Sequence, residues 1–224
     1  MKKTFKFFCL ALLLSVPTQK TFATNTCIDC HQKNTPTEHA DWKKSVHAAK
    51  GVGCEMCHGG NPNTTDPVKA HQGVLSSKDE KSSIHFQKVP ETCGQCHHQE
   101  FAEFQKSVHY KTLQRTGKGP NCLTCHGAMA TTVLTYADLE QTCSLCHGQP
   151  TQAAKAFSML HTLKNSLAVY RKKSNGNDPK EKEFTERYQA LQKQWHSFNV
   201  TGIAEQAQSL IKEIKNAEEK LKKS

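Results

Sequence analysis

One short pattern occurs five times in this 224-residue chain and constrains its fold more than any other feature. Each copy has two cysteines separated by two residues, with a histidine directly after the second cysteine. The copies span residues 27–31, 54–58, 93–97, 122–126 and 143–147. Together they use ten of the eleven cysteines, so the pattern organises a long stretch of the chain.

This spacing is typical of covalent attachment of c-type haem, in which two thiols bond to the haem vinyl groups and the histidine becomes the proximal iron ligand. The expected attachment residues are Cys27, Cys30, Cys54, Cys57, Cys93, Cys96, Cys122, Cys125, Cys143 and Cys146. The expected proximal ligands are His31, His58, His97, His126 and His147. The sequence therefore predicts five covalently attached haems c.

Zinc knuckles, redox dithiols and structural disulfides also use paired cysteines. Zinc sites do not need a histidine directly after every pair, and a redox dithiol is normally a single motif in a βαβ context. A disulfide framework has no reason to repeat the same two-residue spacing five times. Haem attachment remains the favoured interpretation.

Residues 1–23 are typical of a secretory signal peptide. A lysine-rich start precedes an apolar run over residues 7–16, and small residues at Thr21 and Ala23 allow cleavage before Thr24. The run is shorter than the roughly 20 residues that span a bilayer, although a retained membrane anchor is the alternative. Cleavage would remove Cys9 and leave ten cysteines for five haems.

Export agrees with haem attachment, because finished thioethers cannot be reshuffled in an oxidising compartment. We expect a periplasmic protein, and peripheral association with the membrane is compatible with this location. The formal charge of +10 falls to +6 when the four lysines of residues 1–23 are removed, and haem propionates offset much of the remainder. No nucleic-acid motif accompanies the charge, so a nucleic-acid partner is not expected.

Only 36% of the residues are apolar, below the roughly 45–50% usual for globular domains. Such a chain has too few apolar side chains for an ordinary core around five cofactors. We therefore expect a mostly α fold with extensive loops, a multihaem cytochrome c fold organised around a haem stack. Without haem, most of the first 150 residues should be unfolded.

The chain divides after the signal into residues 24–150, which hold all five motifs, and residues 151–224, which hold no cysteine. Within residues 24–150, a two-haem module is repeated: a motif, an aromatic residue, Lys-Ser-Val-His, a glycine-containing loop and a second motif. The two Lys-Ser-Val-His segments end at His47 and His109, and the fifth motif follows as a single unit.

Residues 151–224 have the apolar periodicity of long helices packed on the haems. One helix should end near residues 174–179, and an apolar stripe follows. The stripe consists of Phe184, Tyr188, Leu191, Trp195 and Phe198. A helical hairpin packed on itself is one possibility, but we expect the apolar face to cover haems, because two helices alone have little to bury against.

Eight histidines lie outside the motifs and are available as distal iron ligands. His47 and His109 are favoured by their equivalent positions in the repeat. His71, His85 and His196 complete the expected set, with His161 as the alternative to His196. His39 and His98 are expected to be solvated. Two histidines on each iron imply comparatively low potentials.

The segment from Ile84 to His109, with Val89-Pro90-Glu91-Thr92 before the third motif, resembles a recurring stretch of multihaem c-type cytochromes. That resemblance implies that His85 and His109 are distal ligands. The tail around Trp195-His196 resembles more loosely the C-terminal helices of pentahaem nitrite reductases and hydroxylamine oxidoreductases. The haem count and size resemble the small pentahaem donor to nitrite reductase. Nitrite reductases usually carry one Cys-x-x-Cys-Lys motif, whereas all five motifs here end in histidine.

The leading hypothesis is an electron carrier of anaerobic respiration, with no catalytic residue, that passes electrons from a quinol-oxidising dehydrogenase to a terminal reductase. The alternatives are a small reductase of a nitrogen or sulfur oxyanion at one five-coordinate haem, and a subunit of a haem-lined filament.

Overall fold

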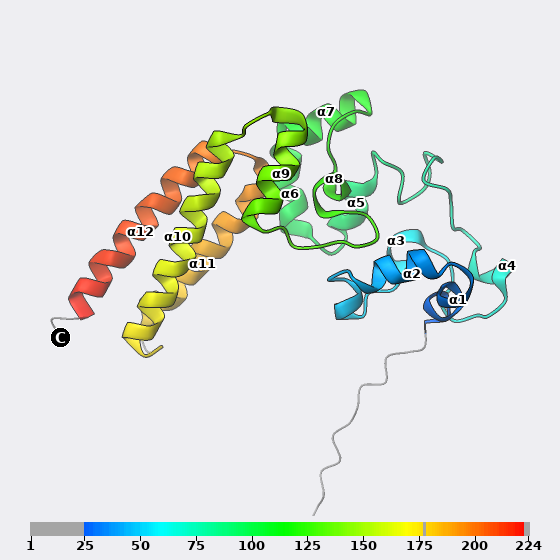
Figure 1. Cartoon of the computed structure of the whole chain (residues 1–224), viewed down its shortest axis with the longest axis horizontal. Helices are drawn as coiled ribbons and strands as arrows, with labels where there is room; N and C mark the ends of the chain where they lie inside the picture. Colours follow the sequence, from blue (N-terminus) through cyan, green and yellow to red (C-terminus); the bar gives the residue numbers. More distant parts are fainter. Residues whose placement is uncertain (1–24, 177, 222–224) are drawn as a thin grey trace, which may run out of the picture.

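The computed structural model describes residues 25–176 and 178–221. That part of the chain consists of α-helices, short 3₁₀ turns and loops, without strands, as predicted. Figure 1 shows short helices α1–α9 joined by long loops and, beside them, three long helices α10–α12. No helix in the described ranges is both long and apolar enough to cross a bilayer. The predicted signal peptide, residues 1–23, lies outside these ranges.

The short helices carry the motifs. They are α1 (Thr26–Asn34), α2 (Pro36–Lys43), α3 (Glu55–His58), α4 (Pro67–Ala70), α5 (Val89–Gly94), α6 (His98–Lys106), α7 (Val108–Thr116), α8 (Cys122–His126) and α9 (Tyr136–His147), with a 3₁₀ turn η1 (Ala48–Lys50). Asparagine caps begin two of the motif helices: the Asn25 side chain accepts from the Cys27 amide, and Asn121 forms a capping box with Thr124. Residues four apart share a face of a helix, so the first cysteine and the histidine of a motif lie together on α1 and α8.

Three motifs end at a glycine that stops the helix. Gly59 (φ 74°, ψ −159°), Gly127 (φ 81°, ψ 158°) and Gly148 (φ 66°, ψ −127°) each follow a motif histidine. This backbone conformation is essentially restricted to glycine. The chain therefore turns away directly after the histidine and leaves its ring at the end of the helix.

The motif region has little apolar core of its own. Among its described residues the buried hydrophobic side chains are Val89, Phe104 and Leu113. Several large apolar side chains are exposed instead, and they include Val46, Met56, Phe86, Val108 and Leu145, each within two residues of a predicted haem ligand. Apolar surface gathered at the ligand positions agrees with a core completed by porphyrin.

Helices α10 (Thr151–Ser174), α11 (Pro179–Gln194) and α12 (Val200–Leu221) form a three-helix bundle, with a 3₁₀ turn η2 (Trp195–Ser197) between α11 and α12. The core side chains are Leu160, Leu163, Leu167, Tyr170, Phe184, Leu191, Ile203, Ala207, Leu210, Ile211, Ile214 and Ala217. Figure 1 shows the far end of this bundle pointing away from α1–α4. Salt bridges between Arg187 and Glu213 and between Lys173 and Glu218 tie its helices together.

The expectation that the apolar face of the tail would cover haems was wrong for most of the stripe. Phe184 and Leu191 are buried in the bundle core, and Tyr188 packs against it. The physical reason is a third helix: the chain breaks at residues 195–199 and α12 returns along α10, so each helix has two partners to bury against. The last residues of the stripe meet the motif region: the Phe198 ring lies edge-on to that of Phe104, and Trp195 lines a pocket with Leu139 and Cys143.

Candidate haem-binding sites

Four of the five motif histidines face a second histidine that is distant in the sequence. The ring centroids are 6.0 Å apart for His31 and His71, 6.1 Å for His97 and His47, 6.2 Å for His126 and His196, and 5.8 Å for His147 and His109. All four partners are among the histidines that the sequence predicts as distal ligands. The structure therefore brings together eight of the ten predicted axial ligands in pairs.

This separation fits two imidazoles on opposite sides of one iron. A metal-bound imidazole nitrogen lies about 2 Å from the metal, and the ring centre lies about 1 Å further away, so two such rings are about 6 Å apart. No three histidine, cysteine, aspartate or glutamate side chains converge as metal ligands within residues 25–176 and 178–221. A zinc site needs about four protein ligands, whereas a porphyrin supplies four nitrogens itself and needs two axial ligands. The residues present thus fit haem.

Second ring nitrogens are held by nearby oxygens in two of the pairs. The Nδ1 atoms of His71, His126 and His196 lie 2.7, 2.9 and 3.2 Å from the backbone carbonyls of Pro67, Thr132 and Lys193. A carbonyl can only accept, so Nδ1 donates and Nε2 is left free for a metal. His31 Nδ1 lies 2.7 Å from the Thr35 hydroxyl, which can either donate to it or accept from it.

Burial favours the neutral form of these rings. Desolvation, followed by the neighbouring His147, lowers the pKa of His109, and desolvation followed by His97 lowers the pKa of His47. Desolvation is also the first cause that lowers the pKa of His196. Neutral imidazole is the form that binds a metal, so the environment prepares these side chains for ligation.

His58 and His85 are the remaining predicted ligands, and no ring contact joins them in the described part of the chain. Their segments nevertheless meet. The Ser83 hydroxyl donates to the carbonyl of Cys57 at 2.6 Å, which places the turn before His85 against the second motif.

The other three histidines lie elsewhere. His161 is exposed on α10 and its Nδ1 lies 3.4 Å from the Asn165 side chain, so His196 and not His161 reaches a motif. His39 is half-buried and its ring lies 5.9 Å from that of Trp42. His98 is exposed at the start of α6.

The motif cysteines are unpaired and lie near one another in chain order. Thiols of successive motifs lie close enough to affect each other's pKa. These neighbours are Cys54 and Cys27, Cys57 and Cys93, Cys93 and Cys122, and Cys125 and Cys143. Burial and then the neighbouring thiols raise the pKa of Cys57, and raise that of Cys125 to about 11. Each motif is thus adjacent to the next one along the chain.

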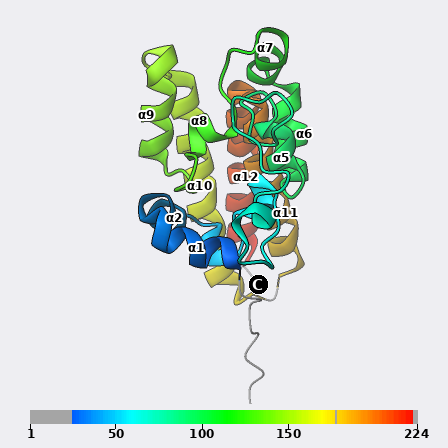
Figure 2. The same ribbon diagram turned by 90° about the vertical axis from the view of Figure 1, so that its right-hand side faces the viewer.

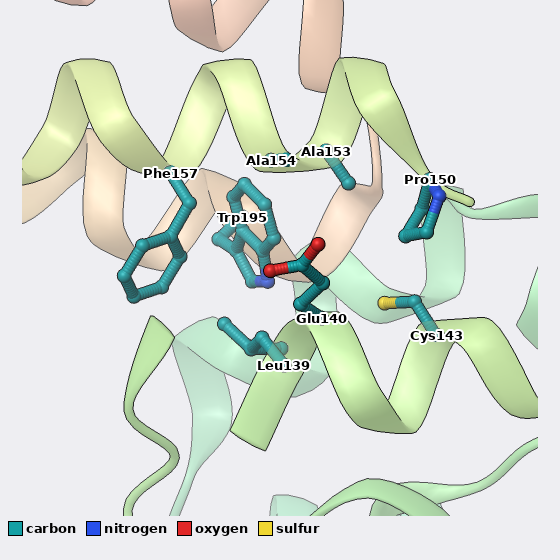
Figure 3. A pocket seen from close by; sticks show the side chains of 8 residues that line it. All are labelled: Leu139, Glu140, Cys143, Pro150, Ala153, Ala154, Phe157 and Trp195. Carbon is teal, nitrogen blue, oxygen red and sulfur yellow. The ribbon is translucent and has the colours of Figure 1, made fainter. Parts of the chain in front are cut away.

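The turn between α11 and α12 contacts the fourth and fifth motifs and their ligands. His196, in η2, faces His126, and the Phe198 ring lies edge-on to His109 with centroids 4.4 Å apart. Figure 3 shows Trp195 with Phe157 beside it and Leu139 below, in a small apolar pocket that the Cys143 sulfur also lines. In Figure 2, α9 stands on the opposite side of the view from α5–α7, and α8 lies between them. Phe198 was not predicted to contact a ligand, because its contact depends on the break between α11 and α12.

Two serines of the repeat also escaped the sequence reasoning. Ser45 and Ser107 stand two residues before His47 and His109 and are both almost fully buried. Their recurrence in Lys-Ser-Val-His was a signal, but the sequence alone does not show that their hydroxyls are enclosed.

Comparison with known proteins gave one match to a protein family. Residues 13–59 match the sequence model of the family cytochrome c554 and c-prime. This segment includes the first two motifs and His47, and it begins before the described residues. Neither the search of curated proteins nor the search of solved structures gave a match. The family match, the mostly helical fold and the repeated motifs support a multihaem c-type cytochrome with covalently bound haem c and a role in electron transfer.

Proposed function

We propose that this chain is an exported pentahaem electron-transfer protein in which every iron lies between two histidines. The observation that carries this proposal is the set of four histidine pairs with ring centroids 5.8–6.2 Å apart. When bound, haem iron supplies a reversible one-electron couple, whose potential is set by its axial ligands and burial. The protein's part is to hold the imidazoles, exclude water and space the haems.

A common rule in the two repeats supports the pairing. His47 follows the first motif and faces the third, at His97; His109 follows the third motif and faces the fifth, at His147. The gap between the second and third motifs supplies His71 to the first motif. His85 lies in the same gap, and we assign it to His58 because Ser83 binds the second motif.

The proximity of the motif cysteines supports a haem chain in sequence order. Each cysteine would attach the edge of a porphyrin, so adjacent thiols imply adjacent porphyrin edges. The chain would run from the first motif to the fifth. Cys30 and Cys146, in the two end motifs, are exposed, as are Cys57 and Cys96. Two exposed ends suit a carrier that accepts electrons at one haem and donates them at another.

The proposed place is the periplasm, in anaerobic respiration, between a quinol-oxidising dehydrogenase and a terminal reductase. The low potentials expected for two-histidine ligation and the predicted signal peptide are the reasons for this choice. Nothing in the proposal requires a substrate site, because the reaction is electron transfer between proteins.

A second candidate function rests on His58. If His85 does not bind the iron above His58, that iron keeps an open position. An open iron suits a small reductase of a nitrogen or sulfur oxyanion. The ligation of this one haem separates the two functions.

Intact mass and electron paramagnetic resonance (EPR) of the ferric protein test the proposal. We expect the mass of residues 24–224 plus five haems, and five low-spin signals with no high-spin iron. His47→Ala should convert the haem bound at Cys93 and Cys96 to high spin, whereas His39→Ala should leave the spectrum unchanged.

Three outcomes would count against parts of the proposal. Fewer than five haem masses would contradict the pentahaem assignment. High-spin iron in the unaltered protein, assigned to the second haem, would favour the reductase. A fully low-spin His47→Ala protein would contradict the pairing of His47 with His97.

A further inference from the structure

We propose that Ser45 and Ser107 are positioning residues that set the orientation of the His47 and His109 imidazoles. The inference rests on the proposed ligation of iron by those two histidines. It goes beyond that ligation, because it assigns the ligand geometry to a buried hydroxyl in each repeat. Both serines close the turn from which the ligand projects.

In the first repeat, the backbone around Ser45 forms a compact turn. The Ser45 amide donates to the Trp42 carbonyl at 2.8 Å, and the Ser45 hydroxyl accepts from the Ala48 amide at 3.0 Å. The Ser45 carbonyl accepts from the Ala49 amide at 3.3 Å. His47 lies inside the loop that the hydroxyl closes.

In the second repeat, Ser107 makes the same three bonds. Its amide donates to the Phe104 carbonyl at 2.9 Å, its hydroxyl accepts from the Tyr110 amide at 3.0 Å, and its carbonyl accepts from the Lys111 amide at 3.3 Å. Here the turn continues into α7, of which Ser107 is the N-cap. His109 again lies in the chain between Ser107 and Tyr110, whose amide donates to the Ser107 hydroxyl.

Both serines are buried within their turns. Ser45 and Ser107 are 3% and 2% exposed, whereas the intervening Val46 and Val108 are 39% and 75% exposed. The valine side chains are therefore too exposed to hold the turns by packing against other side chains. Loss of a capping hydroxyl leaves the amide three residues on without that acceptor, which loosens the turn that carries the histidine.

Because each of these histidines faces a motif far away in the sequence, each serine should affect a haem that is attached far from it in the sequence. Ser45 should act on the haem of the third motif, because His47 faces His97 with an angle of 58° between the ring planes. Ser107 should act on the haem of the fifth motif, where the planes of His109 and His147 form an angle of 44°. The angle between two axial imidazoles controls the splitting of the ferric d orbitals, so EPR reports it directly.

The experiment compares Ser45→Ala and Ser107→Ala with Ser45→Thr and Ser107→Thr in the full haem-loaded protein. Ser158→Ala, at an exposed position of α10, is the matched control. We expect each alanine variant to keep five haems by mass and to shift the largest g value of a single low-spin signal. That signal should be the one lost in His47→Ala or His109→Ala, respectively. The threonine variants, which keep the hydroxyl, should restore it.

An unchanged EPR spectrum in both alanine variants would overturn the positioning role, provided that His47→Ala still removes one low-spin signal. If His47→Ala removes no signal, the proposed ligation itself fails, so the two failures are distinguishable. If an alanine variant is not recovered with five haems, its threonine variant decides. If the threonine variant gives the wild-type signal, the role of the hydroxyl is supported. If its signal shifts as much as the signal shifts in the alanine variant of the other repeat, the role is overturned.

Discussion

A histidine ring binds iron well when its second nitrogen has a partner that fixes the tautomer and the ring orientation. In His71, His126 and His196 this partner is a backbone carbonyl. Every residue has such a carbonyl, so no residue type in the sequence indicates it. The predicted ligands themselves could be selected from their positions in the repeat and beside the aromatic stripe, but the atoms that orient them could not.

At the residue scale, His196→Ala should open one iron. His196 is the ring that faces His126, so the haem bound at Cys122 and Cys125 should become high spin while the other four stay low spin. His161→Ala on the neighbouring helix is the control, because His161 is exposed and paired with Asn165. Optical spectra and EPR of the two ferric proteins check the prediction, and high-spin iron in His161→Ala alone would reverse the assignment.

At the scale of elements, the tail is held by its own packing and meets the motif region at one end. The 3₁₀ turn η2 and Phe198, whose φ of 57° is unusual for an aromatic residue, end α11 and redirect the chain into α12. This break places Trp195, His196 and Phe198 at the motif end of the bundle. The helical periodicity predicted the helices, but the order of their contacts depends on this turn.

The bundle core should be sensitive to cavities. Leu163 is fully buried among α10–α12, so Leu163→Ala should lower the free energy of unfolding of the bundle by about 2–5 kcal/mol. Val169→Ala on the same helix removes a side chain that is 45% exposed and should cost much less. Urea unfolding followed by far-UV circular dichroism measures both, and equal losses would show that the bundle is not packed as described.

Acid should weaken the link between α11 and α12. Hydrogen bonds from Arg187 lower the pKa of the Glu213 carboxyl below its usual range. A lowered folded-state pKa means that the stabilisation is present above the unfolded value of about 4.3 and is lost as pH falls below it. The effect should be small, because the pair is partly exposed to solvent.

Glu213→Gln isolates this contribution. The variant should be less stable than the parent at neutral pH and should lose less stability between about pH 5 and pH 3. Glu205→Gln changes an exposed glutamate of the same helix and serves as the control. Thermal unfolding across this range is the measurement, and parallel pH profiles for the parent and Glu213→Gln would contradict the assignment.

At the scale of the whole molecule, the two regions differ in what holds them together. The bundle has a continuous apolar core, whereas the described motif region buries only a few large apolar side chains. Its cohesion depends on pairs such as His47 with His97, which join segments far apart in the sequence. A cofactor bound by such a pair would act as a cross-link as well as a redox centre.

A protein produced without haem should therefore be ordered only in part. We expect residues 151–221 to keep helical structure and slow amide hydrogen exchange, because their core is made of side chains. Residues 25–150 should exchange rapidly, since their apolar positions lack porphyrin to pack against. Hydrogen exchange with mass spectrometry on the haem-free and haem-loaded chains checks this, and equal protection of residues 25–150 in both would contradict it.

The sequence by itself indicated the kind of chemistry: the repeated Cys-x-x-Cys-His pattern is that of covalent haem c. The five copies predict attachment thiols and proximal histidines locally, because the spacing is set within one helical turn, and the histidines outside the motifs supplied the candidates for second ligands. Only the tertiary structure decided which histidine faces which motif, since His47 reaches the third motif and His196 the fourth across long separations that no local pattern encodes. It also decided where the apolar stripe of the tail is buried. A periodic pattern shows that a helix has an apolar face, but the partner of that face depends on where the chain turns back, here at residues 195–199.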